Sequence, residues 1–222
     1  MSPVEKAHKI DVGRLIVVPI FAFFMTLSFL ILCRDLRALF PINIVKSLLL
    51  IHRVLTVCFY ALVIFLYFLR SSAISTSSSY VTNFIAIVAS FGPFFTLPFL
   101  RKPPLVTQGM LLVADFIIAF GMVLSIYSIY SLGRSFSIIP QARKLIQSGP
   151  YRLVRHPIYL GELISIFGVI LAGLTIPKTI LYCALVVCQV YRAYQEEKLL
   201  ANVFSEYKEY CSKTARFIPG VF

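Results

Sequence analysis

Two short polar stretches adjoin long apolar runs in this chain and hold most of the residues that could do chemistry. Residues 149–161 read GPYRLVRHPIYLG, and further along the chain come Arg192 and the adjacent pair Glu196 and Glu197. Ionisable groups at a membrane boundary are costly and usually functional. An apolar segment long enough to fold back on itself separates the two stretches, so we expect them to meet at one membrane surface.

The first stretch has the residue pattern of a helix start. Pro157 suits the first helical turn, where its missing N–H costs nothing. His156 and Tyr159 are three residues apart, so both rings can point into one space, and the free N–H groups of a helix start suit a carboxylate. Gly161 permits close approach of a ligand or another backbone. An interfacial belt, in which Tyr and Arg anchor the helix at the headgroups, explains the same residues without chemistry.

The second stretch concentrates charge at the end of an apolar helix. Arg192 and Glu196 are i, i+4 neighbours, a spacing that also forms surface ion pairs worth only a few tenths of a kcal/mol. Glu197 doubles the negative charge, and two adjacent carboxylates at a lipid boundary are costly unless they face a cation. If the two stretches meet, they can clamp a small ligand that has one cationic and one anionic end.

Long apolar segments must position these groups. The 222 residues are 59% hydrophobic and 14% charged, with mean hydropathy +0.88, whereas a soluble domain carries about 25% charged residues. The apolar residues form long blocks rather than the short alternating segments of a transmembrane barrel. We therefore predict an all-α polytopic transmembrane helical bundle whose last two segments form a tight helical hairpin. The predicted segments are 15–33, 47–69, 80–100, 105–132, 158–174 and 178–194.

The net charge of +12 fits a membrane better than a nucleic acid, because the basic residues lie at segment ends, near anionic headgroups. One side of the predicted bundle receives both termini, both polar stretches and most of the Lys and Arg residues, so we expect it to face the cytoplasm. The sequence has neither a basic stripe with stacking aromatics nor metal-ligand spacing, so we expect no nucleic acid and no metal as partner. Within the fourth segment, Asp115 is expected to pair with Arg53 or another bundle residue, and contact with the substrate is the alternative.

The ordered combination of GPYRLVRHPIYLG, an apolar hairpin and RxxxEE resembles the isoprenylcysteine carboxyl methyltransferases, in a wider group that includes membrane phospholipid methyltransferases. The resemblance covers roughly residues 120–222 and includes LGRSFS at 132–137 and the pattern FSEYKEY to RFIP at 204–219. It implies a methyltransferase core in 120–222, with a cofactor-binding loop, the hairpin and a tail, and N-terminal helices in 1–119 that bind the acceptor. It also implies S-adenosyl-L-methionine as methyl donor.

The resemblance carries site residues over by motif position. It implies two catalytic residues: Glu196, which holds the cofactor from the far end of the hairpin, and Arg192, which binds and orients the substrate. Arg143 stands where the eukaryotic enzymes place a histidine. The residues implied to bind the cofactor are Gln141, Arg143, Lys144, Leu145, Ile146, Tyr151, His156, Pro157, Tyr159, Glu196 and Glu197.

The implied reaction is methyl transfer to a lipophilic acceptor that enters sideways from the bilayer. The named family substrate is the carboxylate of a prenylated cysteine, in the endoplasmic reticulum of a eukaryote or the plasma membrane of a prokaryote. A phospholipid amine and a small thiol are alternatives, because the cofactor motifs do not encode the acceptor. Such an acceptor must lose a proton, and Glu196, Glu197 and His156 are the candidates to take it. The GPYRxxRHPxY strip also occurs in membrane sterol reductases that use NADPH, and a non-catalytic membrane protein is a further alternative.

Overall fold

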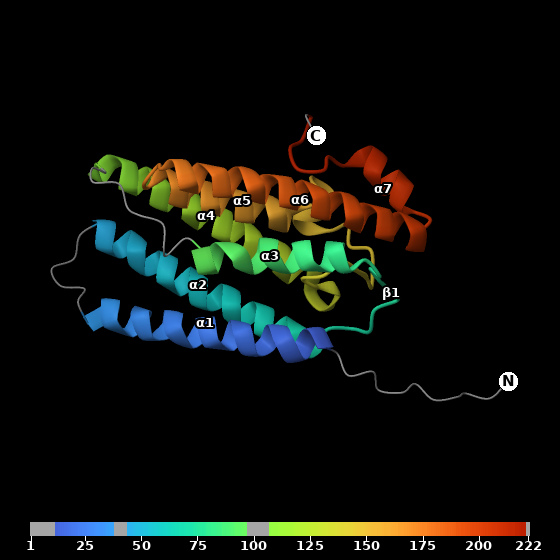
Figure 1. Cartoon of the computed structure of the whole chain (residues 1–222), viewed down its shortest axis with the longest axis horizontal. Coiled ribbons are helices and arrows are strands. Elements are labelled where there is room, and N and C mark those ends of the chain that lie inside the picture. Colours follow the sequence, from blue (N-terminus) through green and yellow to red (C-terminus); the bar gives the residue numbers. More distant parts are fainter. Residues whose placement is uncertain (1–11, 38–43, 97–106, 221–222) are drawn as a thin grey trace.

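The computed structural model describes residues 12–37, 44–96 and 107–220, and it confirms the predicted all-α helical bundle (Figure 1). Each long helix of the described ranges occupies one predicted apolar segment. Residues 97–100 and 105–106, which belong to the predicted third and fourth segments, lie outside the described residues. The long helices are α1 (Val12–Arg37), α2 (Ile44–Leu69), α3 (Tyr80–Thr96), α4 (Gln108–Leu132), α5 (Pro157–Leu171) and α6 (Ile176–Val203).

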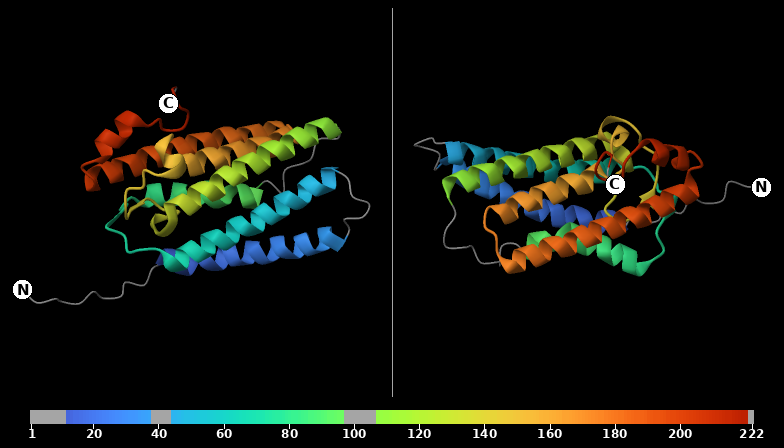
Figure 2. Two further views of the ribbon diagram at one scale, coloured as in Figure 1. Left: turned by 180° about the vertical axis from the view of Figure 1, so that it is seen from behind. Right: turned by 90° about the horizontal axis from the view of Figure 1, so that it is seen from above.

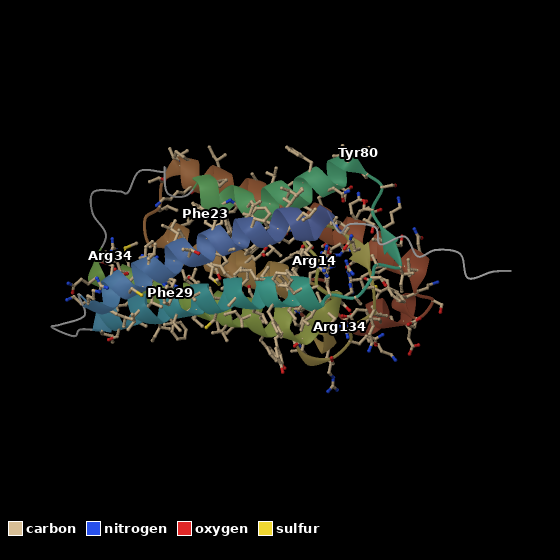
Figure 3. All side chains as sticks on the ribbon, turned by 90° about the horizontal axis from the view of Figure 1, so that it is seen from below. Arg14, Phe23, Phe29, Arg34, Tyr80 and Arg134 are labelled. Carbon is tan, nitrogen blue, oxygen red and sulfur yellow. The ribbon has the colours of Figure 1, made fainter. Side chains whose placement is uncertain are left out.

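Length and composition place five of these six helices in two groups, while α6 belongs to neither, so the predicted segment 178–194 is not among the candidate spans. Within the described ranges, three stretches are long and apolar enough to cross a membrane, namely Gly13–Arg37, Lys46–Leu69 and Gln108–Ser135. Shorter apolar helices cover Tyr80–Pro93 and Pro157–Leu171. Large apolar side chains such as Phe23 and Phe29 are exposed on the outside of α1 (Figure 3), where hydrocarbon is their natural solvent.

The polar elements gather at one end of the bundle, where α2, α4 and α6 end and α1, α3 and α5 begin (Figures 1 and 2). The strands β1 (Ser75–Thr76) and β2 (Gln141–Ala142) pair there in antiparallel fashion, so the polar segment after α2 is fixed to the segment after α4. Three short helices complete this end, namely η2 (Gly133–Ser135), η3 (Gly149–Arg152) and α7 (Tyr207–Lys213).

Two arginines from other elements cap the end of α2. Arg14 of α1 donates from Nε to the carbonyl oxygen of Tyr67 at 3.1 Å, and Arg134 of η2 donates from Nε to that of Leu69 at 2.8 Å. The last carbonyls of a helix have no intrahelical partner and form the negative end of its dipole. Figure 3 shows Arg14 and Arg134 at the same end of the bundle and Arg34 at the opposite end.

The closest helix packing lies between α4 and α5, because small residues line both facing surfaces. A Cβ added at Gly161 would lie 2.7 Å from the carbonyl oxygen of Gly121 and 2.4 Å from Oγ of Ser125, and one at Gly168 would lie 2.8 Å from the carbonyl oxygen of Ala114. The close approach allowed by Gly161 is therefore to another backbone. The predicted hairpin of α5 and α6 is present, with a short turn at 172–175, but α4 is the nearer neighbour of α5.

Two contacts between ionisable residues of different helices lie away from the polar end. Nδ1 of His52 lies 3.6 Å from Oδ1 of Asp115, whereas Arg53 contacts Asp35 at 3.3 Å. The structure thus pairs Asp115 with a bundle residue, as predicted, and the partner is His52 rather than Arg53. Pairing lowers the cost of placing ionisable groups at membrane depth.

Candidate active site

A polar cavity opens at the end of the bundle where the polar elements gather. Its empty volume, including the open mouth, is about 960 Å³, within the range of roughly 300–1,000 Å³ that is typical of small-molecule sites. The loop after α4, the start of α5, the end of α6 and α7 supply its wall. The predicted site residues found in this wall are Gln141, Lys144, Leu145, Ile146, Tyr151, His156, Tyr159, Arg192 and Glu196.

The two polar stretches meet through His156, Tyr159 and Glu196. Pro157 begins α5, and the rings of His156 and Tyr159 stack with their centroids 5.4 Å apart and their planes 4° from parallel. The hydroxyl of Tyr159 donates a hydrogen bond to Oε1 of Glu196, while Nδ1 of His156 lies 3.8 Å from Oε2 of the same carboxylate. The start of α5 therefore holds the carboxylate of α6 against the cavity.

Arg192 lies deep in the wall and is only 2% exposed. Its Nη1 donates to Oε1 of Gln189 at 3.1 Å, and its Nη2 donates to the carbonyl oxygen of Ile138 at 3.0 Å. The guanidinium carbon lies 4.4 Å from the centroid of the Tyr159 ring, a favourable cation–π arrangement. Among the described residues its Nε has no hydrogen-bond partner, so the guanidinium is rigidly held and still has donor capacity.

Glu197 does not line the cavity and instead joins an ion cluster behind it. Its Oε1 accepts from Nε of Arg155 at 2.8 Å and contacts Nε2 of His156 at 3.2 Å, and its Oε2 accepts from Nη2 of Arg216 at 2.8 Å. Burial raises the pKa of Glu197, but the hydrogen bonds from His156, Arg216 and Arg155 outweigh burial and hold that pKa well below its ordinary value. Glu197 therefore supports the site from behind and does not face a ligand there.

Two further predicted residues, Arg143 and Pro157, also lie outside the wall. Arg143 is buried and donates from Nη2 to Oε1 of Gln141 at 2.6 Å. The amide of Gln141 in turn donates to Oγ1 of Thr76 at 3.2 Å. Arg143 thus orients Gln141 and ties it to β1, while Pro157 sets the start of α5.

The C-terminal segment supplies two wall residues that the sequence reasoning missed, Tyr207 and Tyr210. The backbone N–H of Arg155 donates to the carbonyl oxygen of Ala215 at 2.8 Å. The hydroxyl of Tyr210 donates to the backbone carbonyl oxygen of Tyr151 at 2.7 Å. These bonds hold the tail against the loop before α5. The FSEYKEY pattern at 204–210 was the available signal, because its tyrosines are the residues that reach the cavity.

A second cavity, which is apolar, lies between α1, α2, α3, α4 and α5 and has an empty volume of about 1030 Å³. Its wall includes Phe21 of α1, Val63 of α2, Ala89 of α3, Met122 of α4 and Val169 of α5. We call it the apolar cavity and the first one the polar cavity. The two cavities share four wall residues, namely Ser90, Phe136, Ile138 and Glu162.

Glu162 is the ionisable residue among those four, and the sequence reasoning did not single it out. It follows Gly161 directly and lies one helical turn into the apolar α5. An ionisable residue at such a position is a functional candidate in a membrane protein.

Within the described ranges, no group of three or more His, Cys, Asp or Glu side chains could hold a metal ion.

Two comparisons with known proteins found matches to this chain. The family model described as phospholipid methyltransferase matches residues 109–207, which include most of the wall of the polar cavity. The cobalt-zinc-cadmium resistance protein CzcN of Cupriavidus metallidurans is 33% identical over 83 residues, which cover 34% of this chain and 35% of that protein. The chain thus matches only about a third of the length of this curated relative. The family match confirms, over residues 109–207, the predicted resemblance to the phospholipid methyltransferase group of membrane methyltransferases.

Proposed function

We propose that this protein transfers a methyl group from S-adenosyl-L-methionine to a lipophilic acceptor that enters from the membrane. The observation that carries the proposal is the contact between the two cavities. A polar cavity with a carboxylate and a buried arginine adjoins an apolar cavity inside the helical bundle, and the two share wall residues. A polar donor and an apolar acceptor tail can therefore lie on opposite sides of one junction.

The polar cavity has a donor set that fits S-adenosyl-L-methionine. The carboxylate of Glu196 suits the cationic groups of the cofactor, and Lys144 and the N-terminus of α5 suit its carboxylate. The side chains of Leu145 and Ile146 and the ring of Tyr151 offer apolar and aromatic surface for a flat base. When bound, the cofactor supplies an electrophilic methyl group on a sulfonium.

We assign acceptor binding to the apolar cavity and to Arg192. Helices α1, α2 and α3 contribute much of the apolar wall, which supports the proposal that residues 1–119 bind the acceptor and residues 120–222 form the methyltransferase core. The carboxylate of a prenylated cysteine is one candidate head, because the Arg192 guanidinium can orient it. A protic head, such as an amine or a small thiol, is the second candidate, and Glu162 at the junction favours it.

Catalysis at this site consists of positioning and exclusion of water. Holding two reactants in line within a closed site removes much of the entropic barrier to their reaction, and water-poor surroundings strengthen the nucleophile. Arg192 acts here as a fixed cation, since Gln189, Ile138 and Tyr159 immobilise it. Arg14, Arg134 and most other Lys and Arg residues of the described ranges lie on elements at the polar end. We therefore propose that this end faces the cytoplasm, from the plasma membrane of a prokaryote or the endoplasmic reticulum of a eukaryote.

Calorimetric titration of the detergent-purified protein with S-adenosylhomocysteine, and separately with NADPH, tests the proposal. We expect micromolar binding of S-adenosylhomocysteine and its loss in His156→Ala, with Glu209→Gln on the exposed face of α7 as a matched control. Binding of NADPH alone supports a sterol-type reductase and rejects the proposal. Binding of neither by protein with an intact helical circular dichroism spectrum supports a non-catalytic membrane protein.

A further inference from the structure

Glu162 occupies the junction between the polar and the apolar cavity. It is half-buried and lies in the wall of both cavities. The other three shared residues, Ser90, Phe136 and Ile138, carry no ionisable side chain. An acceptor whose tail lies in the apolar cavity and whose head reaches the polar cavity must therefore pass this carboxylate.

A hydrogen-bond relay fixes the Glu162 side chain from one side only. Arg192 is a pure donor, so its bond from Nη1 requires that the oxygen of the Gln189 amide faces it. The amide nitrogen of Gln189, which is completely buried, then faces Glu162 and donates to Oε2 at 2.6 Å. Among the described residues, Oε1 of Glu162 has no hydrogen-bond partner. The relay thus leaves one oxygen of an oriented carboxylate for a ligand.

The sign of the charge at the junction selects the head of the acceptor. A carboxylate head beside Glu162 meets a like charge at close range, and Glu196 in the wall of the polar cavity adds a second one. Of the basic residues in that wall, Arg192 lies beyond the Gln189 amide, while Lys144 and Arg155 come from the segment between α4 and α5. Like charges in water-poor surroundings repel strongly. An ammonium head instead gains a charge-assisted hydrogen bond to the oxygen that the relay leaves unused.

Resting on the proposed function, we infer that Glu162 is the catalytic residue that selects an amine acceptor and removes its proton. The carboxylate accepts one proton from the ammonium head, which leaves a neutral amine with a free electron pair. That pair forms the new N–C bond to the methyl group, and the pair of the breaking S–C bond returns to sulfur. The products are S-adenosylhomocysteine and the methylated ammonium, and the proton on Glu162 leaves through the open polar cavity.

Two synthetic lipids with equal apolar chains test this assignment in the full-length protein: a long-chain primary alkylamine and an N-acetyl S-alkylcysteine. We expect wild-type protein to methylate the alkylamine at least tenfold faster than the carboxylate lipid. In Glu162→Gln, amine turnover falls by about a hundredfold to ten-thousandfold, as for loss of a general base, while the affinity for S-adenosylhomocysteine changes by less than about twofold. Glu162→Asp restores part of the turnover, and Glu209→Gln matches wild type.

The pH profile separates a base from a structural role. We expect amine turnover of the wild type to rise with pH through the ionisation of Glu162. The profile of Glu162→Gln lacks that ionisation and shows only the ionisation of the amine itself. Tyr159 on α5 and Arg192 and Glu196 on α6 are the titratable groups of these two helices that line the polar cavity together with Glu162. Full amine turnover by Glu162→Gln, or transfer to the carboxylate lipid alone, overturns the assignment. Transfer to neither lipid by wild type that binds S-adenosylhomocysteine also overturns it, whereas absence of that binding overturns the proposed function itself.

Discussion

The hydroxyl of Tyr159 at the start of α5 donates a hydrogen bond to Glu196 near the end of α6. This contact joins the two polar stretches and fixes a carboxylate in the wall of the polar cavity. The stacked ring of His156 supports Tyr159 from one side, and the guanidinium of Arg192 lies over its ring. The tyrosine is therefore the residue that connects the proposed cofactor side of the site with the acceptor side.

Replacing Glu196 by Gln is expected to weaken cofactor binding. A hydrogen bond to a charged group contributes about 1.5–3 kcal/mol, so affinity should fall about tenfold to a hundredfold. The loss should be larger for S-adenosyl-L-methionine than for S-adenosylhomocysteine, because only the former carries the sulfonium charge. Calorimetry on both ligands measures the difference, with the exposed Glu206→Gln as control. Equal affinities in Glu196→Gln and wild type would remove Glu196 from the cofactor pocket.

Arg192→Lys should impair use of the acceptor and leave cofactor binding nearly intact. Lysine keeps the charge but not the planar fork that holds Gln189 and Ile138 together. Glu162 then loses its orientation, and a displacement of about 1 Å in a catalytic group can cost about a hundredfold in rate. Steady-state kinetics should show kcat/KM for the acceptor reduced at least tenfold, with the affinity for S-adenosylhomocysteine within about twofold of wild type. A cofactor defect larger than the acceptor defect contradicts this division of roles.

Filling the apolar cavity should exclude long acceptor chains selectively. Ala89 of α3 is buried in its wall, whereas Ile87 on the same helix is exposed on the outside. Ala89→Phe should displace about two methylene groups of a bound chain, each worth about 0.8 kcal/mol, so turnover of a long-chain acceptor should fall about tenfold. Ile87→Phe is the matched control. If both variants retain wild-type turnover of long-chain and short-chain acceptors, the tail does not bind in this cavity.

Gly161→Ala should destabilise the bundle through α4. The new Cβ would lie 2.4 Å from Oγ of Ser125 and 2.7 Å from the carbonyl oxygen of Gly121, so helix α5 has to move. Overpacking of this kind costs roughly 1–3 kcal/mol, or about 2–4 °C in Tm for each kcal/mol in a chain of this size. Thermal unfolding followed by circular dichroism should show the decrease. Gly109→Ala on α4 has open space around its Cβ and should not lower Tm; an equal decrease in both variants would point to a general effect of alanine.

The ion cluster of Glu197 predicts a stability change at acidic pH. Its pKa is held below the ordinary value of 4.5 by His156, Arg216 and Arg155 despite burial. A lowered pKa in the folded state contributes stability that is fully present above pH 4.5 and is lost as the pH falls toward the folded-state pKa. Tm measured from pH 7 down to pH 3 should therefore fall more steeply in wild type than in Glu197→Gln.

At neutral pH the same Glu197→Gln variant should be less stable by about 3 kcal/mol, because Arg155 and Arg216 lose a largely buried partner. Glu209→Gln serves as control, since the ion pair of Glu209 with Lys213 is exposed and exposed pairs contribute little. Parallel pH profiles for wild type and Glu197→Gln would show that the cluster does not couple to folding.

The sequence by itself determined the helical membrane bundle, the meeting of the two polar stretches and the resemblance to membrane methyltransferases. These follow from local causes, since hydropathy sets the segments, proline sets a helix start, and residues three or four apart share a helix face. His156, Tyr159, Arg192 and Glu196 were singled out as candidates for that reason. The family match over residues 109–207 then confirmed the resemblance.

Only the tertiary structure decided which charged residue faces a ligand and which supports the site from behind. Glu196 and Glu197 are adjacent in sequence, but adjacent residues of a helix point in different directions. Glu196 therefore lines the polar cavity, whereas Glu197 contacts Arg155 and Arg216. Glu162 lies in an apolar helix, and its sequence neighbours do not indicate a site. It lies between two cavities because α1 to α4, which come much earlier in the chain, form most of the wall of the apolar cavity. Sequence spacing fixes the face of one helix, but the neighbours of that face depend on how separate helices pack.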